Sequence, residues 1–190
     1  MNSKISENHE FKNIDFSKSK LKFSNYENCV FTNCIFSNTD LSKINFIECK
    51  FRNSDFSSAK NYDTSFRNIE FVGCKFLGFH FEDCNQLLIS FSFQECKLNF
   101  SSFYKMKIPN TKFKNCEIHE ADFTETDFSK STFDNCDFTN SAFTNTILTK
   151  ADFRTSYNFV IDPEINKITK AKFSSVNILG LLAKYDLEIE

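Results

Sequence analysis

The sequence predicts an all-β solenoid, a quadrilateral parallel β-helix with four pentapeptides per coil. Two observations lead to it: a large apolar residue recurs every five positions, and a small or aliphatic residue usually stands two positions before it. In an α-helix a step of five rotates the side chain by about 140°, and in a straight strand an odd step reverses its direction. An interval of five therefore requires an extended chain that bends once per pentapeptide.

The large apolar residues form two series that differ in phase by two positions. The first begins at Phe11 and is interrupted at Asn61 and Gln86, and the second begins at Phe93. Phenylalanine recurs within them at every fourth pentapeptide, which predicts a square coil. The two all-Phe columns are Phe11, Phe31, Phe51, Phe71 and Phe91, then Phe93, Phe113, Phe133, Phe153 and Phe173. We expect Phe31 to stack on Phe51 at the spacing of paired strands, about 4.8 Å.

The small inward position holds all eight cysteines of the chain. They are Cys29, Cys34, Cys49, Cys74, Cys84, Cys96, Cys116 and Cys136. We expect inert buried thiols and no disulfides, because side chains one coil apart exceed the usual Cβ separation of about 3.8 Å in a disulfide. The position two after each large residue is often asparagine, which tolerates left-handed backbone angles and predicts a corner there.

The phase of the repeat changes at residues 86–93, in the stretch QLLISFSF. Phe91 can fill the small inward position of the new register, with Phe93 as its next large residue, so that a bulge or a short bent loop suffices. Leu87 and Leu88 are expected to be exposed there as a small apolar patch. The other interruption, Asn61 in KNYDTS, is interpreted as a local kink.

The ends of the chain depart from the repeat. We expect residues 1–10 to form an N-terminal tail or cap, residues 11–153 the β-helix, and residues 154–190 a C-terminal cap. The cap is predicted to hold a loop around Asp162-Pro163, a last inward pair at Ala171 and Phe173, and an α-helix over 175–185 that begins at a serine N-cap.

This C-terminal helix has more apolar surface than one face can bury. A terminal coil has open strand edges and exposed core that need covering. We expect one face of the helix to cap the coil and the remainder to hold a homodimer together. The alternative is a helix packed wholly on its own chain. The predicted dimer interface comprises Ile178, Leu181, Leu182 and Tyr185.

The repeat resembles the pentapeptide-repeat family, whose usual pattern is A(D/N)LXX. The pattern is present here as Ala121-Asp122-Phe123, Ala151-Asp152-Phe153, Thr39-Asp40-Leu41 and Ser54-Asp55-Phe56, within a match that spans about Phe11 to Phe153. The resemblance implies a right-handed β-helix. It also implies dimerisation through C-terminal segments, as in Qnr-type quinolone-resistance proteins, which mimic a DNA duplex and bind DNA gyrase or topoisomerase IV.

Net charge, apolar runs and motifs exclude several classes of function. A net charge of -2 argues against direct nucleic-acid binding. The N-terminus lacks the apolar segment of an export signal, and no apolar run is long enough to span a membrane, so we expect a cytoplasmic protein without a membrane partner. His9, His80 and His119 occupy three different repeat positions, and no catalytic or phosphate-binding motif is present. We therefore expect no enzymatic activity, no cofactor and no metal site.

Charge along the chain supplies the one indication of a partner. Residues 121–190 hold seven basic and eleven acidic side chains, the most acidic part of the sequence. Six carboxylates in consecutive pentapeptides are predicted to form an acidic belt that binds a partner: Glu120, Asp122, Glu125, Asp127, Asp134 and Asp137. The leading hypothesis is a DNA mimic that binds a type II topoisomerase. The alternative is an interaction scaffold whose partner is unrelated to topoisomerases, with the carboxylates serving solubility.

Overall fold

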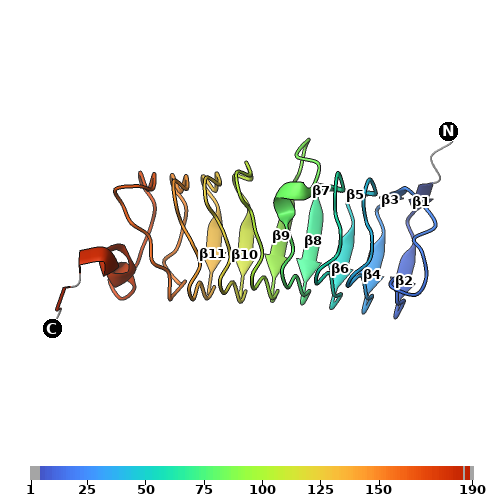
Figure 1. The fold of residues 1–190 in the computed structure, drawn as a ribbon, viewed down its shortest axis with the longest axis horizontal. Helices are drawn as coiled ribbons and strands as arrows, with labels where there is room; N and C mark the ends of the chain where they lie inside the picture. The colour runs from blue at the N-terminus through green and yellow to red at the C-terminus, as the bar shows by residue number, and fades with distance from the viewer. Residues whose placement is uncertain (1–4, 186, 189–190) are drawn as a thin grey trace.

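Short parallel strands stack along one axis into a long rod, which the described part of the chain follows from its N-terminal strands at one end to its C-terminal 3₁₀ helices at the other (Figure 1). The computed structural model describes residues 5–185 and 187–188. The strands are β1 (Ile5–Glu7), β2 (Glu10–Lys12), β3 (Asn25–Glu27), β4 (Val30–Thr32), β5 (Asn45–Ile47), β6 (Lys50–Arg52), β7 (Ser65–Arg67), β8 (Ile69–Val72), β9 (Phe91–Gln94), β10 (Lys112–Lys114) and β11 (Thr132–Asp134). The described residues also form the 3₁₀ helices η1 (Phe81–Asp83), η2 (Ile178–Leu181) and η3 (Ala183–Tyr185).

The strands form two parallel sheets on different sides of the coil. One sheet has the order β1-β3-β5-β7, and the other has the order β2-β4-β6-β8-β9-β10-β11. Phe31 pairs with Phe51 and Tyr26 with Phe46, so that the register advances by four pentapeptides per coil. Isolated bridges such as Asp40 to Lys60 continue the same pairing on the remaining sides. The predicted parallel β-helix with four pentapeptides per coil is confirmed.

Stacked phenylalanine rings fill the interior. The rings of Phe31 and Phe51 are 4.8 Å apart and 11° from parallel, as the spacing of four pentapeptides predicts. Rings of neighbouring columns meet edge to face, for example Phe46 and Phe51 at 5.2 Å and 78°. Both arrangements are favourable for aromatic quadrupoles and contribute about 0.5–1.5 kcal/mol per pair beyond burial. The backbone ladder and the ring columns therefore share one repeat distance.

Left-handed backbone angles mark the corners of the coil. Asn28, Asn33 and Asn38 have φ of 50°, 54° and 55°, which confirms asparagine as a corner residue. The Asn33 side-chain amide also donates to the Asn13 side chain one coil below, at 3.1 Å. Lys43 at 63° and other non-asparagine residues take the same angle. The coil imposes this geometry, and among residues with a side chain asparagine adopts it at low cost.

The phase change is absorbed by one enlarged coil. Ile69 pairs with Phe91 and Phe71 with Phe93, so the register step here is two positions longer than in the other coils. Phe91 thus takes the small inward position and Phe93 the large one, as the sequence predicts. The additional length enlarges a loop at 85–90 that projects beyond the neighbouring corners (Figure 1). Leu87 and Leu88 in this loop are 65% and 70% exposed, which confirms the expected apolar patch.

Asn61 occupies the inward position of an uninterrupted coil. Phe46 and Phe66 remain in register on the adjoining side. The Asn61 side chain is buried, and its Nδ2 donates to the His80 carbonyl oxygen at 2.6 Å and to Cys84 Sγ at 3.1 Å. A buried amide needs such partners, which it finds in the adjacent coil.

The solenoid extends beyond residues 11–153 at both ends. Ile5–Glu7 pairs with β3, so part of the expected N-terminal tail is already a strand, and residues 1–4 lie outside the described residues. At the other end Asp152 bridges Lys172, and the ring of Phe173 stacks on that of Phe153 at 5.6 Å. The repeat pattern weakens in both regions because fewer inward positions hold phenylalanine.

The predicted α-helix over 175–185 is wrong. The segment forms η2 and η3, with hydrogen bonds from Leu182 N to Leu179 O and from Tyr185 N to Leu182 O, each at 2.9 Å. Gly180 lies against Phe159, whose carbonyl oxygen leaves no room for a Cβ, and the Gly180 carbonyl accepts from Ile161 N. Packing on the last coil therefore takes a backbone acceptor that an α-helix would use, and so short a helix is marginal by itself.

Burial should make the thiols of the folded protein unreactive. All eight cysteines are free and buried, and desolvation raises the pKa of Cys49 to about 12. At pH 8 we expect almost no reaction with Ellman's reagent, because the thiolate is the reacting form. In guanidinium all eight should react. Rapid reaction of two or more thiols in the folded protein would contradict this packing.

Candidate interaction surfaces

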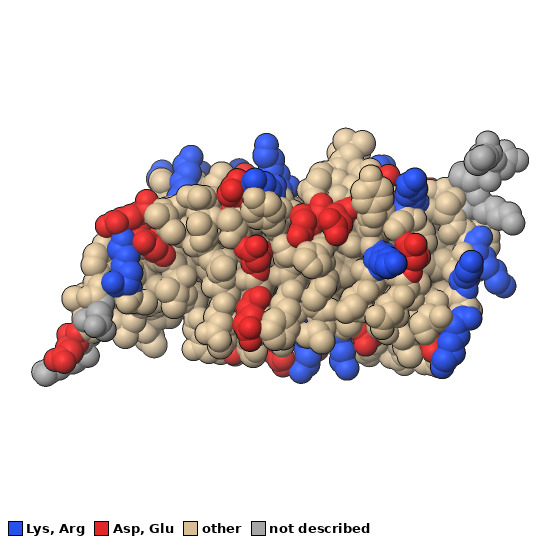
Figure 2. Space-filling view, in the orientation of Figure 1, with Lys and Arg blue, Asp and Glu red and all other residues tan. Residues whose placement is uncertain are grey.

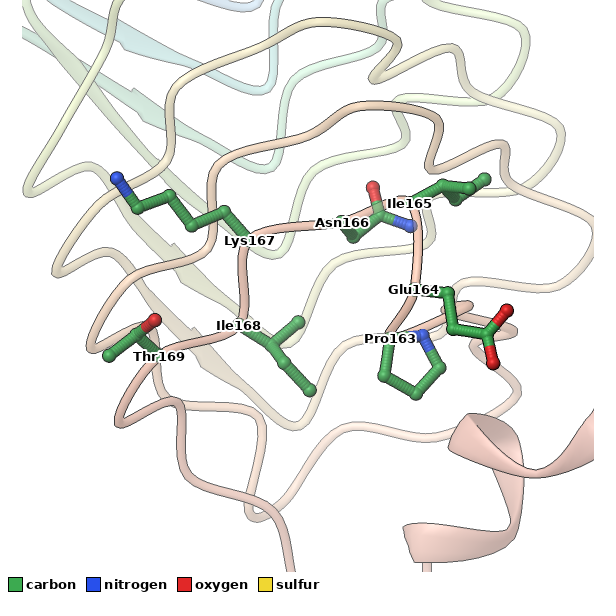
Figure 3. Close-up of a pocket in the computed structure, with 7 residues that line it drawn as sticks. All are labelled: Pro163, Glu164, Ile165, Asn166, Lys167, Ile168 and Thr169. Carbon is green, nitrogen blue, oxygen red and sulfur yellow. The ribbon is translucent and has the colours of Figure 1, made fainter.

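The outer surface of the rod has shallow hollows. One hollow lies beside the turn of the last coil and is lined by residues 163–169 (Figure 3). Its charged groups are Glu164 and Lys167. Within residues 5–185 and 187–188 no group of three His, Cys, Asp or Glu side chains is placed to hold a metal ion. The same residues include no helix long and apolar enough to cross a membrane.

Three carboxylates of the acidic belt stabilise the turns of the repeat. Asp122 and Asp127 are half-buried, and each accepts a hydrogen bond at 2.9 Å from the backbone N–H two residues further on. Asp137 makes the same bond to Thr139 N at 3.1 Å, and its carboxylate also lies 3.0 Å from His119 Nε2. Although burial opposes it, hydrogen bonds from Thr139, Asn158 and His119 bring the pKa of Asp137 below its ordinary value. These carboxylates therefore have a role in the fold itself.

The other three members of the belt are exposed. Glu120 and Glu125 lie at successive corners, with φ of 52° and 57°. Glu125 forms an ion pair with Lys105 one coil below, at 3.6 Å. Asp134 accepts a hydrogen bond from the Thr155 hydroxyl at 3.0 Å. These three carboxylates are therefore accessible to a partner.

The coil distributes the acidic belt around the rod. The bridges of Asp122, Asp127 and Asp137 and the strand that holds Asp134 belong to four different sides of the coil. Glu120 and Glu125 lie at the two ends of the side that carries Asp122. On the face seen in Figure 2, acidic groups stand singly or in small groups between uncharged side chains. Only Glu120, Asp122 and Glu125 are thus brought together on one side, which we call the acidic side.

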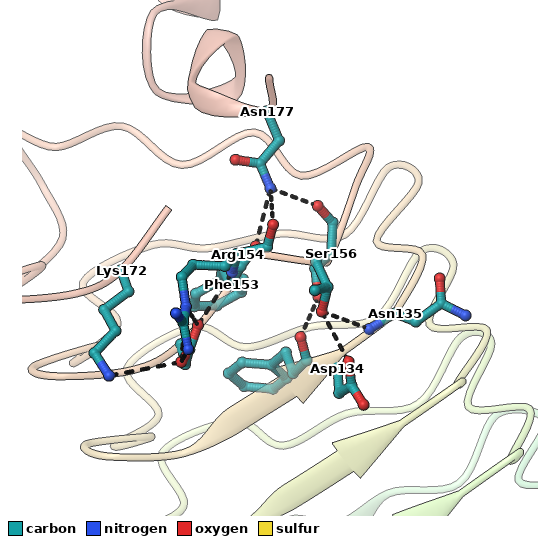
Figure 4. A network of polar contacts seen from close by, with 10 residues as sticks. Asp134, Asn135, Phe153, Arg154, Ser156, Lys172 and Asn177 are labelled. Carbon is teal, nitrogen blue, oxygen red and sulfur yellow. Dashed lines mark hydrogen bonds and ion pairs between the residues drawn. The ribbon is translucent and has the colours of Figure 1, made fainter. Parts of the chain in front are cut away.

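A polar plug closes the C-terminal end of the rod. The Asn177 side-chain Nδ2 donates to the carbonyl oxygens of Phe153 at 2.9 Å and Ser156 at 2.7 Å (Figure 4). Asn177 itself is held by Ser174, since each backbone N–H donates to the other's side-chain oxygen. The plug gives the Ser156 carbonyl the donor that a further coil would supply, and it adds a second donor to the Phe153 carbonyl, which also accepts from Ser156 N.

An ionic latch fastens the segment after the plug to the loop of the last coil. Lys184 Nζ lies 2.8 Å from Asp162 Oδ1 and 2.6 Å from Glu164 Oε2, and the Tyr185 hydroxyl donates to Glu164. The Lys184 ammonium lowers the pKa of both carboxyl groups. Because these folded-state pKa values are lowered, the latch is complete at neutral pH and is lost as the pH falls through them.

The residues predicted to form a dimer interface differ in their surroundings. Leu181 packs against the hydrophobic core of its own chain, and Leu182 is half-buried. Ile178 and Tyr185 are 44% and 47% exposed. Further exposed apolar side chains near this end are Val160, Ile165, Val176 and Leu179.

Two features of this surface are absent from the predictions made from the sequence. The role of Asn177 cannot be inferred from its sequence context, because it depends on carbonyl groups of the preceding coil, more than twenty residues earlier. Lys130, Lys150 and Lys170 recur at the interval of one complete coil. That interval places them at one corner, and it could have indicated a basic column beside the acidic belt.

Comparison with known proteins is consistent with this architecture. The family model described as pentapeptide repeat region matches residues 86–157, and the model described as pentapeptide repeats (8 copies) matches residues 10–47. Together the two models cover more than half of the chain. No curated protein matches the sequence.

Two solved structures illustrate the similarity in fold. Trypsin-treated QnrB1, described as a plasmid-mediated fluoroquinolone resistance protein, has a TM-score of 0.65 and 18% identity over 99% of each chain. HetL from the cyanobacterium Nostoc sp. Strain PCC 7120, described as a pentapeptide repeat protein involved in heterocyst differentiation regulation, has a TM-score of 0.73 and 14% identity. That match covers 90% of this chain and 87% of HetL.

Removal of the plug should loosen the last coil. Asn177→Ala leaves the Phe153 and Ser156 carbonyls without this donor, so we expect the terminal coil to lose about 1–3 kcal/mol of stability. Hydrogen exchange of the backbone amides in residues 148–173 would measure the loss. Thr144→Ala, at an exposed position on a coil side, serves as the control. Equal protection in the two variants would show that Asn177 does not hold the end closed.

Proposed function

Since this chain belongs to the pentapeptide-repeat family, we propose that it is a non-enzymatic protein that binds a protein partner through its outer surface. The partner we propose is a type II topoisomerase, DNA gyrase or topoisomerase IV, in the cytoplasm. The supporting observation is the acidic side, where Glu120, Asp122 and Glu125 hold negative charge at fixed positions on a rigid rod.

Competition with DNA is the mechanism that this geometry supports. A rod with carboxylates fixed by corners and turns can take the place of a row of phosphates on a basic protein surface. Asp122 is held by its bond to Thr124 N, so its side chain would lose little conformational freedom on binding. The description of QnrB1 as a fluoroquinolone resistance protein supports the choice of partner. Resistance would follow if binding displaced DNA from the drug-sensitive complex.

A second candidate is a scaffold for an unrelated protein partner. The separation of Asp127, Asp134 and Asp137 onto other sides favours it, because a DNA mimic gains from continuous negative charge. HetL, described as acting in differentiation regulation, has the same fold. The two candidates make different predictions for topoisomerase binding.

Dimerisation through the C-terminal end is part of the proposal. Val176, Ile178 and Leu179 expose apolar side chains on the segment that closes the rod. Exposed apolar surface of this kind is typical of a protein interface, and a dimer about this end would double the length of the rod.

The topoisomerase proposal predicts an effect on gyrase supercoiling. At micromolar concentration the protein should inhibit supercoiling, or protect it from a fluoroquinolone. The variant Glu120→Gln, Asp122→Asn and Glu125→Gln removes three charges and keeps the acceptor in the turn, so we expect the effect to fall at least tenfold. Glu48→Gln, Glu70→Gln and Glu95→Gln removes three charges elsewhere and should behave as the unmodified protein. Absence of binding, inhibition and protection would favour the unrelated partner.

The dimer proposal predicts a mass of twice 22.2 kDa by light scattering. Ile178→Asp with Leu179→Asp should give a folded monomer, because each subunit would have to bury two carboxylates in the dimer interface. Leu77→Asp, at an exposed site in the middle of the rod, is the control and should leave the mass unchanged. A monomeric unmodified protein, or a double variant that remains dimeric, would contradict this interface.

A further inference from the structure

One edge of the rod carries lysine in three successive coils. Ser92, Lys112, Thr132, Asp152 and Lys172 are paired in register, and the residue two before each of them lies at one corner. In the last three coils of this column that corner residue is Lys130, Lys150 and Lys170, which we call the lysine edge. Adjacent lysines are therefore about 4.8 Å apart along the rod.

The fold gives no reason for lysine at these positions. Lys130, Lys150 and Lys170 have φ of 61°, 61° and 57°, where asparagine or glycine is less strained. Asparagines at another corner bond to each other from coil to coil, as Asn135 Nδ2 does with Asn115 at 3.0 Å. Stacked ammonium groups repel one another. In the described part of the chain none of the three lies within salt-bridge distance of a carboxylate.

The surroundings of the lysine edge add positive charge. Lys107 and Lys167 lie on one flank of the corner, and Lys112 and Lys172 lie on the other. On the second flank Asp134 is exposed, whereas the other two carboxylates of these flanks are occupied. Asp127 accepts from Ser129 N, and Asp152 forms ion pairs with Arg154 and Lys172. Ser129, Thr149 and Thr169 precede the three lysines in the sequence, and the Thr149 hydroxyl is buried.

The projecting loop lies on this same edge. Because Ser92 pairs with Lys112, residue 90 lies below the corner residue Asn110 of the next coil, and loop 85–90 leads into this corner. Its exposed apolar side chains are Leu87 and Leu88. In Figure 1 the loop protrudes from the upper edge of the rod, and Figure 2 shows basic groups along that edge toward the C-terminal end. A projecting apolar tip and a basic column thus share one straight edge.

We propose that this edge binds the surface of an anionic lipid bilayer. Leu87 and Leu88 enter the boundary between headgroups and acyl chains, while the lysine edge contacts anionic headgroups; an apolar insertion combined with a basic cluster is the pairing that holds peripheral proteins on membranes. The rod lies on the bilayer and does not cross it. This proposal is independent of the protein partner, since the acidic side does not adjoin the lysine edge.

A bilayer fits these observations better than a nucleic acid. Against a phosphate backbone Leu87 and Leu88 would remain in water, and the lysine edge has no exposed aromatic side chain on which bases could stack. Because the two leucines and the lysine edge lie along one straight edge, they can contact a flat bilayer surface at the same time. A bilayer also offers apolar and anionic groups at the same surface.

Vesicle flotation tests the proposal. We expect the protein to float with vesicles of phosphatidylcholine and phosphatidylglycerol at 7:3, and not with phosphatidylcholine alone. Lys130→Asn, Lys150→Asn and Lys170→Asn should reduce the bound fraction at least fivefold, and the variant should remain folded because asparagine suits these corners. Leu87→Ser with Leu88→Asn should reduce binding at least threefold. High salt should weaken binding by the unmodified protein.

The matched control removes three exposed lysines elsewhere. Lys22→Asn, Lys43→Asn and Lys60→Asn changes the net charge equally and should retain binding. Circular dichroism and thermal unfolding check that each variant is folded. Failure of the unmodified protein to bind anionic vesicles would overturn the proposal, as would an equal loss in the control. Binding to a DNA duplex by fluorescence anisotropy, without binding to vesicles, would assign the lysine edge to nucleic acid instead and would also overturn it.

Discussion

The structure depends on the match between two distances. Parallel strands pair about 4.8 Å apart, and stacked phenylalanine rings such as those of Phe31 and Phe51 are separated by the same 4.8 Å. A core residue can therefore repeat in every coil without strain in the ladder of backbone hydrogen bonds. A larger rise per coil would separate the stacked rings, and a smaller rise would make them collide. This match explains why one aromatic residue can fill a core of this length.

The interior was predictable from the sequence because periodicity fixes it. The pentapeptide interval and its fourfold multiple determine which side chains point inward and which stack, and even the change of phase at Phe91 and Phe93 follows from this rule. The C-terminal segment has no repeat, so its helix was predicted from local preference alone. There, the contact of Gly180 with Phe159 decided the outcome, and such a contact depends on a distant part of the chain.

The outer surface was harder to predict, because neighbours in sequence are separated by the corners of the coil. Six carboxylates close together in the sequence lie on four sides, whereas three lysines that are each one full coil apart share one edge. Charge counted along the chain thus described the C-terminal half as acidic. The same half has an acidic side and a basic edge. Which carboxylates also hold turns, as Asp137 does, depends on hydrogen bonds that composition does not show.

The enlarged coil and the plug together limit how such a chain can change in length during evolution. Because each coil pairs only with its neighbours, duplication of a block of four pentapeptides would add one complete layer and leave every ring stacked. An insertion shorter than a pentapeptide produces a protruding loop, as at 85–90. Asn177 closes one end, so new layers can be added only on its N-terminal side. Length in this lineage should therefore vary in whole coils, and shorter insertions should persist as new surface loops.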